Sequence, residues 1–390
     1  MKRFGTGTVR IRKGYTMQYR PFGNTGVSLS ALGFGSMRLP SSTVDGKEVF
    51  DTEESIRIIH RAFELGVNYI DTAPYYCDSQ SEIIVGKALK GWRDKVYVST
   101  KNPIENSSGE DWRARLEKSL KNLDIEYIDF YHMWGISLEA YNNEINVPNG
   151  PLEAALRAKE EGLIKHISFS FHDKAENLMP LIDTGNFETI LLQYNLLDRS
   201  NEAGIAYAKG KGIGIVVMGP VGGGRLGMPS EAIQNLLPGK VSSSAQLALR
   251  FVLANPGVSC ALSGMGSMAM VEENCRVASN DAPLSEAELV QVNTSMEENK
   301  RMAELYCTGC NYCMPCPQEV NIPLNFQIMN YHRVYKITDY AKEQYKLIGT
   351  VDWMKGKNAA ACIECGLCED KCPQKIEIRK QLKETAAILG

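Results

Sequence analysis

Eight of the eleven cysteines in this 390-residue chain lie in two short groups near the C-terminus. The first group, beginning at Cys307, reads CTGCNYCMPCP, and the second, beginning at Cys362, reads CIECGLCEDKCP. In each group three cysteines are spaced by two residues, and a fourth precedes a proline. Thiols packed this closely are typical metal ligands. The remaining three are isolated, as inert core cysteines usually are: Cys77, Cys260 and Cys275.

Three cysteines at two-residue gaps wrap a short loop around a cube, so they reach three irons of one [4Fe–4S] cluster. In bacterial two-cluster ferredoxins the fourth cysteine, next to proline, reaches the other cluster. That pattern implies one cluster held by Cys307, Cys310, Cys313 and Cys372, and another held by Cys362, Cys365, Cys368 and Cys316. The spacing matches in the second group and is one residue short in the first. Zinc is the alternative, but zinc would need neither the third cysteine of each triplet nor the Cys-Pro ends.

A second set of polar side chains ends three successive apolar runs in the first half of the chain. Asp71 lies in NYIDTAPYY with Tyr76 five residues later, Lys101 ends VYVSTK, and YIDFYHMWG ends in His132 and Trp134. A buried carboxylate keeps a neighbouring lysine charged, and a charged lysine lowers the pKa of a nearby phenol. If the three runs are neighbouring strands, Asp71, Lys101 and Tyr76 together make a proton donor for use near neutral pH.

The elements that would position these residues alternate from about residue 32 to about residue 280. Eight short apolar runs are separated by eight longer segments with apolar residues at three-to-four spacing, several of which end in glycine. This alternation predicts an α/β fold of the (β/α)8 TIM-barrel type, with reactive residues at the C-terminal ends of the strands. A doubly wound open sheet is the alternative, but its G-x-G-x-x-G fingerprint after a first strand is missing.

Beyond about residue 285 no strand pattern resumes, so we expect a tail over 1–16, the barrel over 17–285, and a small α-helical, ferredoxin-like iron–sulfur domain over 286–390. The formal net charge of −3 argues against a nucleic-acid partner or a membrane surface. No window approaches the roughly 20 apolar residues of a membrane helix, and the basic N-terminus lacks the apolar run of a secretory signal. A cytoplasmic protein is therefore expected.

The chain resembles the aldo/keto reductase family in the segments NYIDTAPYY, VYVSTK and YIDFYHMW, followed by HISFSFHD, LLQYN, VVMGPVGGG and SGMGSMAMVEEN. The tail resembles the bacterial subgroup in which that barrel is fused to a ferredoxin-like [4Fe–4S] domain. The resemblance covers residues 17 to about 385. It implies NAD(H) or NADP(H) lying across the C-terminal mouth of the barrel. It also implies hydride transfer to or from a carbonyl carbon while Tyr76, tuned by Asp71 and Lys101, supplies or takes the proton.

The resemblance also implies nucleotide contacts, with several departures from the family pattern. Phe171 replaces the asparagine that usually follows Ser170, and Met218 stands where many members stack a tyrosine on the nicotinamide. Gly264 and Met270 replace the lysine and arginine that bind a 2′-phosphate, which favours NADH or a mixed preference. The implied contacts are Ser170, Gln193, Met218, Gly219, Pro220, Val221, Gly223, Gly264, Met265, Gly266, Glu273 and Asn274.

The family's fourth catalytic residue is a histidine five positions after the aspartate of the fourth strand. Counted from Asp129, that position holds Trp134, and His132 lies two residues earlier on the same side, roughly 6–7 Å deeper. An indole N–H donates a hydrogen bond but cannot titrate. Either a catalytic role for His132 or a core position with one hydrogen bond agrees with the sequence.

Several functions follow from these patterns. The main one is an NAD(P)H-dependent reductase of a small-molecule carbonyl. An activated alkene such as an enone is an alternative substrate, because this histidine is also replaced in a relative that reduces double bonds next to a ketone. A further alternative is an electron-transfer protein whose clusters exchange single electrons with a redox partner. A final alternative is that the clusters have a structural role only and hold the C-terminal domain to the barrel.

Overall fold

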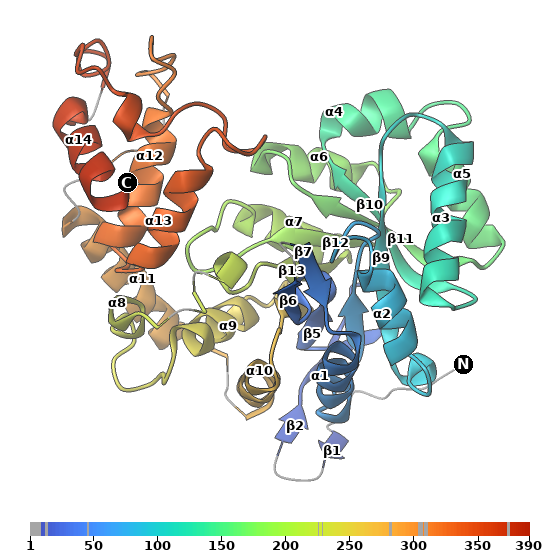
Figure 1. Ribbon diagram of the computed structural model, residues 1–390. Helices are drawn as coiled ribbons and strands as arrows, with labels where there is room; N and C mark the ends of the chain where they lie inside the picture. Colours follow the sequence, from blue (N-terminus) through green and yellow to red (C-terminus); the bar gives the residue numbers. More distant parts are fainter. Residues whose placement is uncertain are drawn as a thin grey trace. The chain divides into compact units, whose positions relative to one another are not determined.

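The computed structural model describes residues 9–11, 15–44, 47–224, 226–227, 229–280, 283–302, 307, 311–372 and 375–390. The chain forms two compact units, one made of residues 1–223 and 248–284, the other of residues 224–247 and 285–390. The first unit contains the barrel, and the second is built mainly of helices (Figure 1). Residues 224–247, which the sequence analysis places with the barrel, belong to the second unit. The predicted domain boundaries at 16/17 and 285/286 stay predictions.

Eight parallel strands close into a barrel, so the predicted (β/α)8 architecture is confirmed. Each strand overlaps one of the eight apolar runs, although β9 and β10 extend past the ends of theirs. The closed order is β10-β11-β12-β13-β14-β5-β8-β9. The strands are β5 (Leu32–Gly35), β8 (Tyr69–Asp71), β9 (Tyr97–Pro103), β10 (Ile128–Ile136), β11 (Ile164–Phe171), β12 (Thr189–Gln193), β13 (Gly214–Met218) and β14 (Cys260–Gly264).

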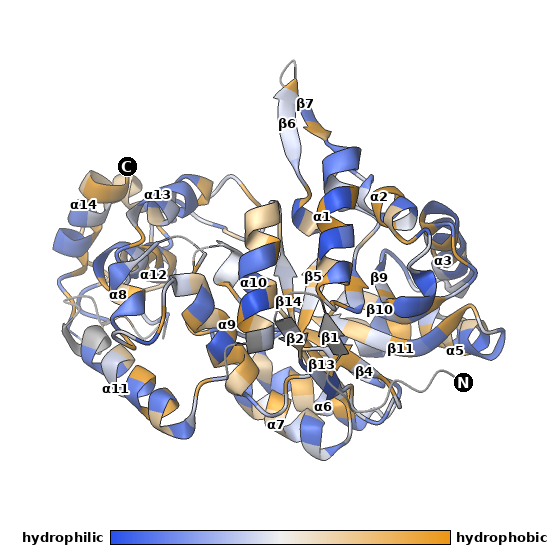
Figure 2. Cartoon of the chain, turned by 90° about the horizontal axis from the view of Figure 1, so that it is seen from below, coloured by the Kyte–Doolittle hydropathy of each residue, from blue (hydrophilic) through white to orange (hydrophobic). Residues whose placement is uncertain are grey.

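Helices follow the strands and surround the barrel (Figure 1). They are α1 (Thr52–Glu64), α2 (Ser81–Ala88), α3 (Gly109–Leu123), α5 (Pro151–Glu160), α6 (Leu178–Asp183), α7 (Glu202–Gly210), α9 (Ser244–Ala254) and α10 (Met268–Asn280). In α1 the side chain of Asp51 caps the helix by accepting from the Glu54 N–H at 2.9 Å. Figure 2 shows hydrophilic and hydrophobic residues alternating along α1 and α10, as expected of helices with one buried face.

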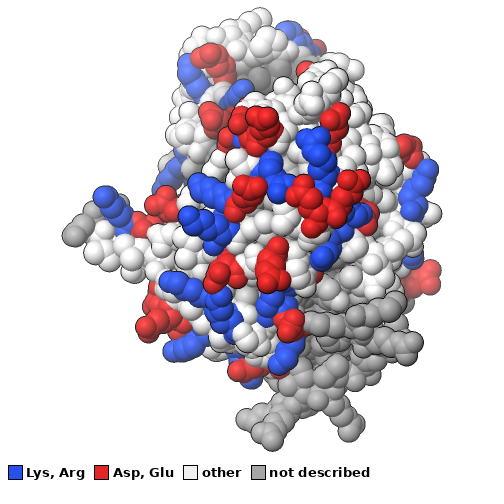
Figure 3. Space-filling model, turned by 90° about the vertical axis from the view of Figure 1, so that its right-hand side faces the viewer, with Lys and Arg blue, Asp and Glu red and all other residues white. Residues whose placement is uncertain are grey.

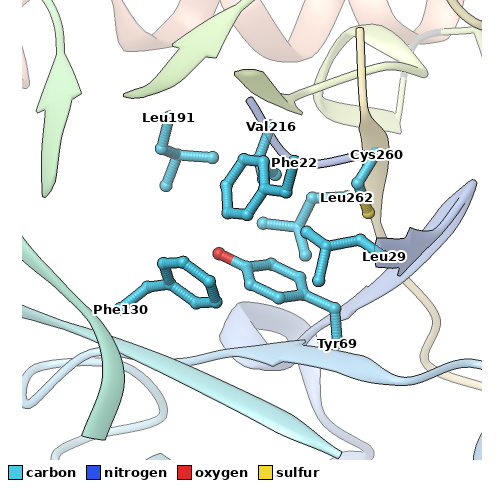
Figure 4. Close-up of a cluster of buried hydrophobic side chains, with 8 residues drawn as sticks. All are labelled: Phe22, Leu29, Tyr69, Phe130, Leu191, Val216, Cys260 and Leu262. Carbon is cyan, nitrogen blue, oxygen red and sulfur yellow. The ribbon is translucent and has the colours of Figure 1, made fainter. Parts of the chain in front are cut away.

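The N-terminal end of the barrel is filled by apolar side chains. An antiparallel hairpin of β3 (Tyr19–Pro21) and β4 (Ser28–Ser30) brings Phe22 to this end, where its ring packs against Gly214 so closely that a Cβ there would overlap it. Figure 4 shows the resulting cluster of Phe22, Leu29, Tyr69, Phe130, Leu191, Val216, Cys260 and Leu262. The barrel interior is thus a packed core at this end, which leaves the C-terminal end of the strands for a functional site.

Two further hairpins decorate the first unit. β1 (Val9–Ile11) and β2 (Tyr15–Met17) pair antiparallel in the segment that was expected to be a tail. β6 (Ser41–Val44) and β7 (Lys47–Phe50) form an exposed hairpin that stands away from the barrel in Figure 2. Between β5 and this hairpin lies a single 3-10 turn, η1 (Ser36–Arg38).

The second unit contains helices α8 (Glu231–Gln234), α11 (Glu286–Met302), α12 (Ile322–Arg333), α13 (Thr338–Leu347) and α14 (Ile378–Leu389). Within its described residues the pairing of extended backbone is limited to one bridge, between Val320 and Lys357, as the loss of strand pattern predicts. The buried side chain of Asn325 on α12 accepts from the Ala359 N–H at 2.8 Å. This bond links α12 to the segment that directly precedes the second cysteine group at Cys362.

None of the described helices is long and apolar enough to span a bilayer. Figure 3 shows the face that carries α3 and α5, on which basic and acidic side chains are interspersed. Several of them pair, such as Arg113 with Glu117 at 2.8 Å and with Glu161 at 2.7 Å. This face therefore presents no large field of a single sign.

Candidate active site and cysteine centre

A buried ion pair lies at the C-terminal end of the barrel. Asp71 is the last residue of β8 and Lys101 lies on β9, and both side chains are only 2% exposed. The Lys101 ammonium pairs with the Asp71 carboxylate and donates to the Thr72 carbonyl oxygen at 2.7 Å. Burial alone would lower the pKa of Lys101, but the Asp71 carboxylate raises it above its ordinary value of 10.5. Lys101 is therefore charged at neutral pH.

Two hydroxyls that sequence analysis missed complete the surroundings of Asp71. Ser99 Oγ donates to Asp71 Oδ2 at 2.5 Å, and the Tyr69 hydroxyl donates to Ser99 Oγ at 2.8 Å. The register places Ser99 directly opposite Asp71. A signal was present in the sequence, because Ser99 lies two residues before Lys101 and so on the same face of the strand. Serine is too common in strands for this spacing to have singled it out.

Tyr76 lies beside the ion pair, as predicted. The Lys101 Nζ is 4.8 Å from the centroid of the Tyr76 ring. The chain then turns sharply through Cys77, Asp78 and Ser79, whose φ angles of 54°, 51° and 64° are left-handed. Burial raises the pKa of Tyr76, and the smaller opposing effect of Lys101 does not restore it. The predicted lowering of this pKa is therefore wrong in sign, because burial outweighs the nearby charge.

His132 and Trp134 have different surroundings although both lie on β10. His132 is fully buried, and its Nε2 is 3.9 Å from Asp71 Oδ2. Among the described residues neither ring nitrogen makes a well-formed hydrogen bond, and a weak interaction with the Phe169 backbone remains. Burial and the neighbouring Lys101 lower the pKa of His132 to about 3. Trp134 is partly exposed and meets the Tyr76 ring edge-on, with 5.8 Å between ring centroids.

Trp134 is therefore the aromatic neighbour of Tyr76, and His132 lies deeper in the barrel. Tyr75, which is 55% exposed, adds a second ring 5.6 Å from Trp134. The strand is irregular here, since its pairing with β11 shifts between Met133 and Ile136. The catalytic roles predicted for Asp71, Tyr76, Lys101, His132 and Trp134 stay predictions, although the structure brings all five residues together.

Predicted nucleotide contacts lie at the same end of the barrel on the strands β11 to β14. The Ser170 hydroxyl accepts from the Gly135 N–H at 2.7 Å. Gln193 and Met218 end β12 and β13 and are directly opposed in register. Gly264 ends β14 and is exposed. Beyond it Met265 is buried, and on α10 the Asn274 amide donates to Ser263 Oγ at 3.2 Å.

The glycine-rich loop after β13 has an open backbone. Gly219, Gly222 and Gly223 have φ angles of 62°, 60° and 68°, a region that glycine enters without a Cβ penalty. A Cβ placed on Gly223 would meet no atom within 4 Å. Pro220 and Val221 complete the turn, while Arg225 lies outside the described residues. The Gly222 N–H already donates to the Gly219 carbonyl oxygen at 2.8 Å, whereas Gly223 is exposed. Backbone N–H groups in such a loop fit a pyrophosphate, and this contact stays a prediction.

Both cysteine groups contribute to one cavity in the second unit. Its lining includes five thiols, from Cys313, Cys316, Cys362, Cys365 and Cys368. Both Cys313 and Cys316 of the first group thus line a cavity with the second group, whereas the crossing pattern assigns only Cys316 to that group. An all-thiol donor set is the one that an iron–sulfur cluster requires.

Of the remaining predicted ligands, the described Cys307 and Cys372 are not among the residues that line this cavity. Cys372 is buried and Cys307 partly exposed, whereas Cys310 lies outside the described residues. Among the described side chains no three potential ligands converge closely enough for a single metal ion. The assignment of each cysteine to a cluster stays a prediction.

Comparison with known proteins agrees with both parts of the chain. Residues 31–297 match the model of the aldo/keto reductase family, and residues 306–377 match that of a 4Fe-4S dicluster domain. L-galactose dehydrogenase of Arabidopsis thaliana is 29% identical over 284 residues, which are 66% of this chain and 87% of that protein. The aldo-keto reductase YhdN of Bacillus subtilis is 32% identical over 215 residues, covering 52% of this chain and 62% of YhdN.

A solved structure supports the same assignment. The holo form of the aldo-keto reductase AKR11C1 from Bacillus halodurans aligns with a TM-score of 0.62 at 27% identity. The alignment covers 72% of this chain and 96% of that one. The family match extends over about two thirds of the chain and includes all eight barrel strands. The chain belongs to the aldo/keto reductase family of oxidoreductases and carries a 4Fe-4S dicluster domain C-terminal to its barrel.

Proposed function

We propose that this protein is an NAD(P)H-dependent reductase of a small-molecule carbonyl, with Tyr76 as its proton donor and two [4Fe–4S] clusters in its C-terminal region. The observation that carries the proposal is the buried Asp71–Lys101 ion pair directly beside the Tyr76 ring. A charged lysine, held in place by a carboxylate and adjacent to a phenol, is an arrangement suited to proton donation.

The chain's own residues account for the proton. A bound nicotinamide supplies the hydride for the carbonyl carbon. The carbonyl oxygen, which becomes negative, takes its proton from Tyr76, a phenol that burial keeps protonated at neutral pH. The charge left on the phenolate is stabilised by Lys101, which Asp71 holds in its charged form. Water is limited at this point, since Asp71 and Lys101 are almost completely buried.

An activated alkene is the second candidate substrate, and Trp134 favours it. The family's histidine is replaced by an indole that cannot titrate, and the nearby His132 is fully buried and stays neutral to about pH 3. Reduction of an enone leaves its carbonyl group in place, so it depends less on a titratable group at the carbonyl oxygen. The rings of Tyr75 and Trp134 also offer a surface for a planar, conjugated substrate.

The decisive variant is Tyr76→Phe, tested anaerobically with NADH and NADPH against aldehydes, ketones and enones. We expect turnover to fall by roughly 10²–10⁴-fold, the usual contribution of a positioned acid, while cluster absorbance and nucleotide binding stay unchanged. Tyr75→Phe is the matched control, because it removes the neighbouring hydroxyl and is expected to retain turnover. A Tyr76→Phe protein that turned over like the wild type would refute the assignment of the acid.

The clusters leave an electron-transfer function as a further candidate. The thiol-lined cavity supports cluster binding, and each cluster accepts one electron whereas a hydride carries two. Exchange between the two centres would need single-electron steps. The visible cluster band distinguishes the candidates: bleaching by NADH or NADPH under anaerobic conditions would indicate exchange. An unchanged band with full carbonyl turnover would favour clusters that only stabilise their domain.

A further inference from the structure

Arg38 lies directly against the end of β14, where the nucleotide is expected to bind. β5 and β14 are neighbours in the barrel, with Gly35 opposite Gly264, and η1 carries Arg38 just beyond this pair. A Cβ placed on Gly264 would lie 3.8 Å from Arg38 Cβ and 3.9 Å from its Cδ. A Cβ on Gly266 would lie 3.3 Å from the Arg38 carbonyl oxygen. The aliphatic part of Arg38 therefore runs alongside Gly264.

The glycine at position 264 leaves bare backbone beside the Arg38 stem. A lysine there, as the family pattern has it, would place its Cβ in contact with the Arg38 stem and a second cation beside the first. In this chain the lysine is absent, and Met270, in place of the arginine, is an apolar side chain that is 51% exposed. Arg38 thus lies beside Gly264, one of the two positions from which an expected cation is missing.

The guanidinium of Arg38 is available for an anion. Arg38 is exposed, and in the part of the chain that the structure describes no hydrogen-bonding or ionic partner engages it. Arg61, by contrast, is committed to Glu272 of α10 at 2.6 Å and to Glu64 at 3.0 Å. An unpaired arginine beside the glycines Gly264 and Gly266 is well placed for charge-assisted, bidentate hydrogen bonds to a phosphate.

We propose that Arg38 binds the 2′-phosphate of NADP(H) and so replaces, from the other side of the β5–β14 seam, the two cations that the sequence lacks. The inference rests on the proposed function, because it requires a dinucleotide across the barrel mouth. It reverses the preference for NADH that the missing lysine and arginine favour. The protein is then specific for NADPH through a residue that follows the first barrel strand.

Nucleotide binding to the anaerobically purified holoprotein tests this assignment without any substrate. Dissociation constants for NADPH and NADH are measured by nicotinamide fluorescence for the wild type, Arg38→Gln, Arg38→Lys and Arg57→Gln. Arg57 is a matched control, since it is an exposed arginine on α1 whose ionic partner is Glu54. We expect Arg38→Gln to weaken NADPH roughly ten- to a hundredfold and leave NADH within twofold, with Arg38→Lys intermediate and Arg57→Gln unchanged.

Two further ligands separate the phosphates of the nucleotide. Binding of 2′,5′-ADP is expected to weaken in Arg38→Gln, whereas binding of 5′-ADP is not. Equal weakening of both ligands, or of NADPH and NADH, would assign Arg38 to the pyrophosphate and overturn the proposal. A wild type that binds NADH at least as well as NADPH would overturn it too. If neither dinucleotide binds the wild type, the proposed function itself fails.

Discussion

Replacing His132 with phenylalanine is expected to make the protein more resistant to acid. In the native state the imidazole is completely buried and lies next to the charged Lys101, and the weak opposing interaction with the Phe169 backbone does not offset these two effects. Its pKa is lowered from 6.5 to about 3. The unfolded chain therefore binds a proton at His132 between these two values, whereas the native protein does not. The stability associated with the neutral ring is complete above pH 6.5 and decreases as the pH falls toward 3.

The size of the effect follows from the distance to the unfolded pKa. Each tenfold rise in proton concentration below pH 6.5 favours the unfolded state by about 1.4 kcal/mol. At pH 5, about one and a half decades lower, His132 alone costs the native state about 2 kcal/mol relative to pH 8. Phenylalanine has no proton to bind and fills a similar volume, so this part of the acid sensitivity disappears in His132→Phe.

The measurement is a double difference. Urea unfolding of the anaerobic holoprotein is followed by circular dichroism at pH 8 and pH 5, and the loss of unfolding free energy is compared between variants. Other titrating groups cancel because they are common to both proteins. Met133→Ala, a buried truncation next in sequence, is the control that lowers stability without removing a titratable group. If His132→Phe lost as much stability between pH 8 and pH 5 as the wild type, the assignment of a buried, neutral ring would be refuted.

Two other substitutions test the surroundings of the acid. Ser99→Ala leaves the buried Asp71 carboxylate without its 2.5 Å hydrogen bond, so we expect roughly 1–3 kcal/mol lower stability and a reduced kcat at unchanged nucleotide affinity. Ser99→Thr, which keeps the hydroxyl, should restore kcat, and failure of this rescue would contradict a positioning role. Trp134→His returns a titratable donor to a position beside Tyr76, so the ratio of kcat/KM for a ketone to that for the matching enone should rise. A ratio that stays constant or falls would show that position 134 does not select between these substrates.

The sequence was sufficient for the barrel because its signal is regular. Apolar runs separated by amphipathic segments bury their apolar faces as strands covered by helices. The structure has eight such strands in one closed barrel. Asp71 and Lys101 were predictable for the same reason, since polar residues at the C-terminal ends of parallel strands meet at one end of a barrel. The 4Fe-4S dicluster domain was predictable from the spacing of the cysteines alone.

The features that sequence analysis missed depend on depth and on contacts between distant segments. The pKa of Tyr76 is governed by burial, which a single loop residue does not reveal. Ser99 is recognised only when its hydroxyl is seen to reach Asp71. Arg38 belongs to the first strand's loop and Gly264 to the last strand, so only closure of the barrel brings them together. Residues 224–247 interrupt the barrel sequence but pack with the second unit.

The division of the chain bears on what the clusters do. Asp71, Tyr76 and Lys101 all lie in the first unit, and the described hydrogen bonds of Asp71 and Lys101 come from residues of that unit. The proposed proton donation by Tyr76 therefore draws only on side chains of the first unit. A purely structural role would be satisfied by one four-thiolate zinc site, whereas this chain has eight grouped cysteines, enough for two [4Fe–4S] clusters. If both clusters form, two one-electron centres would match the two electrons of one hydride, which is the stoichiometry that a redox role requires.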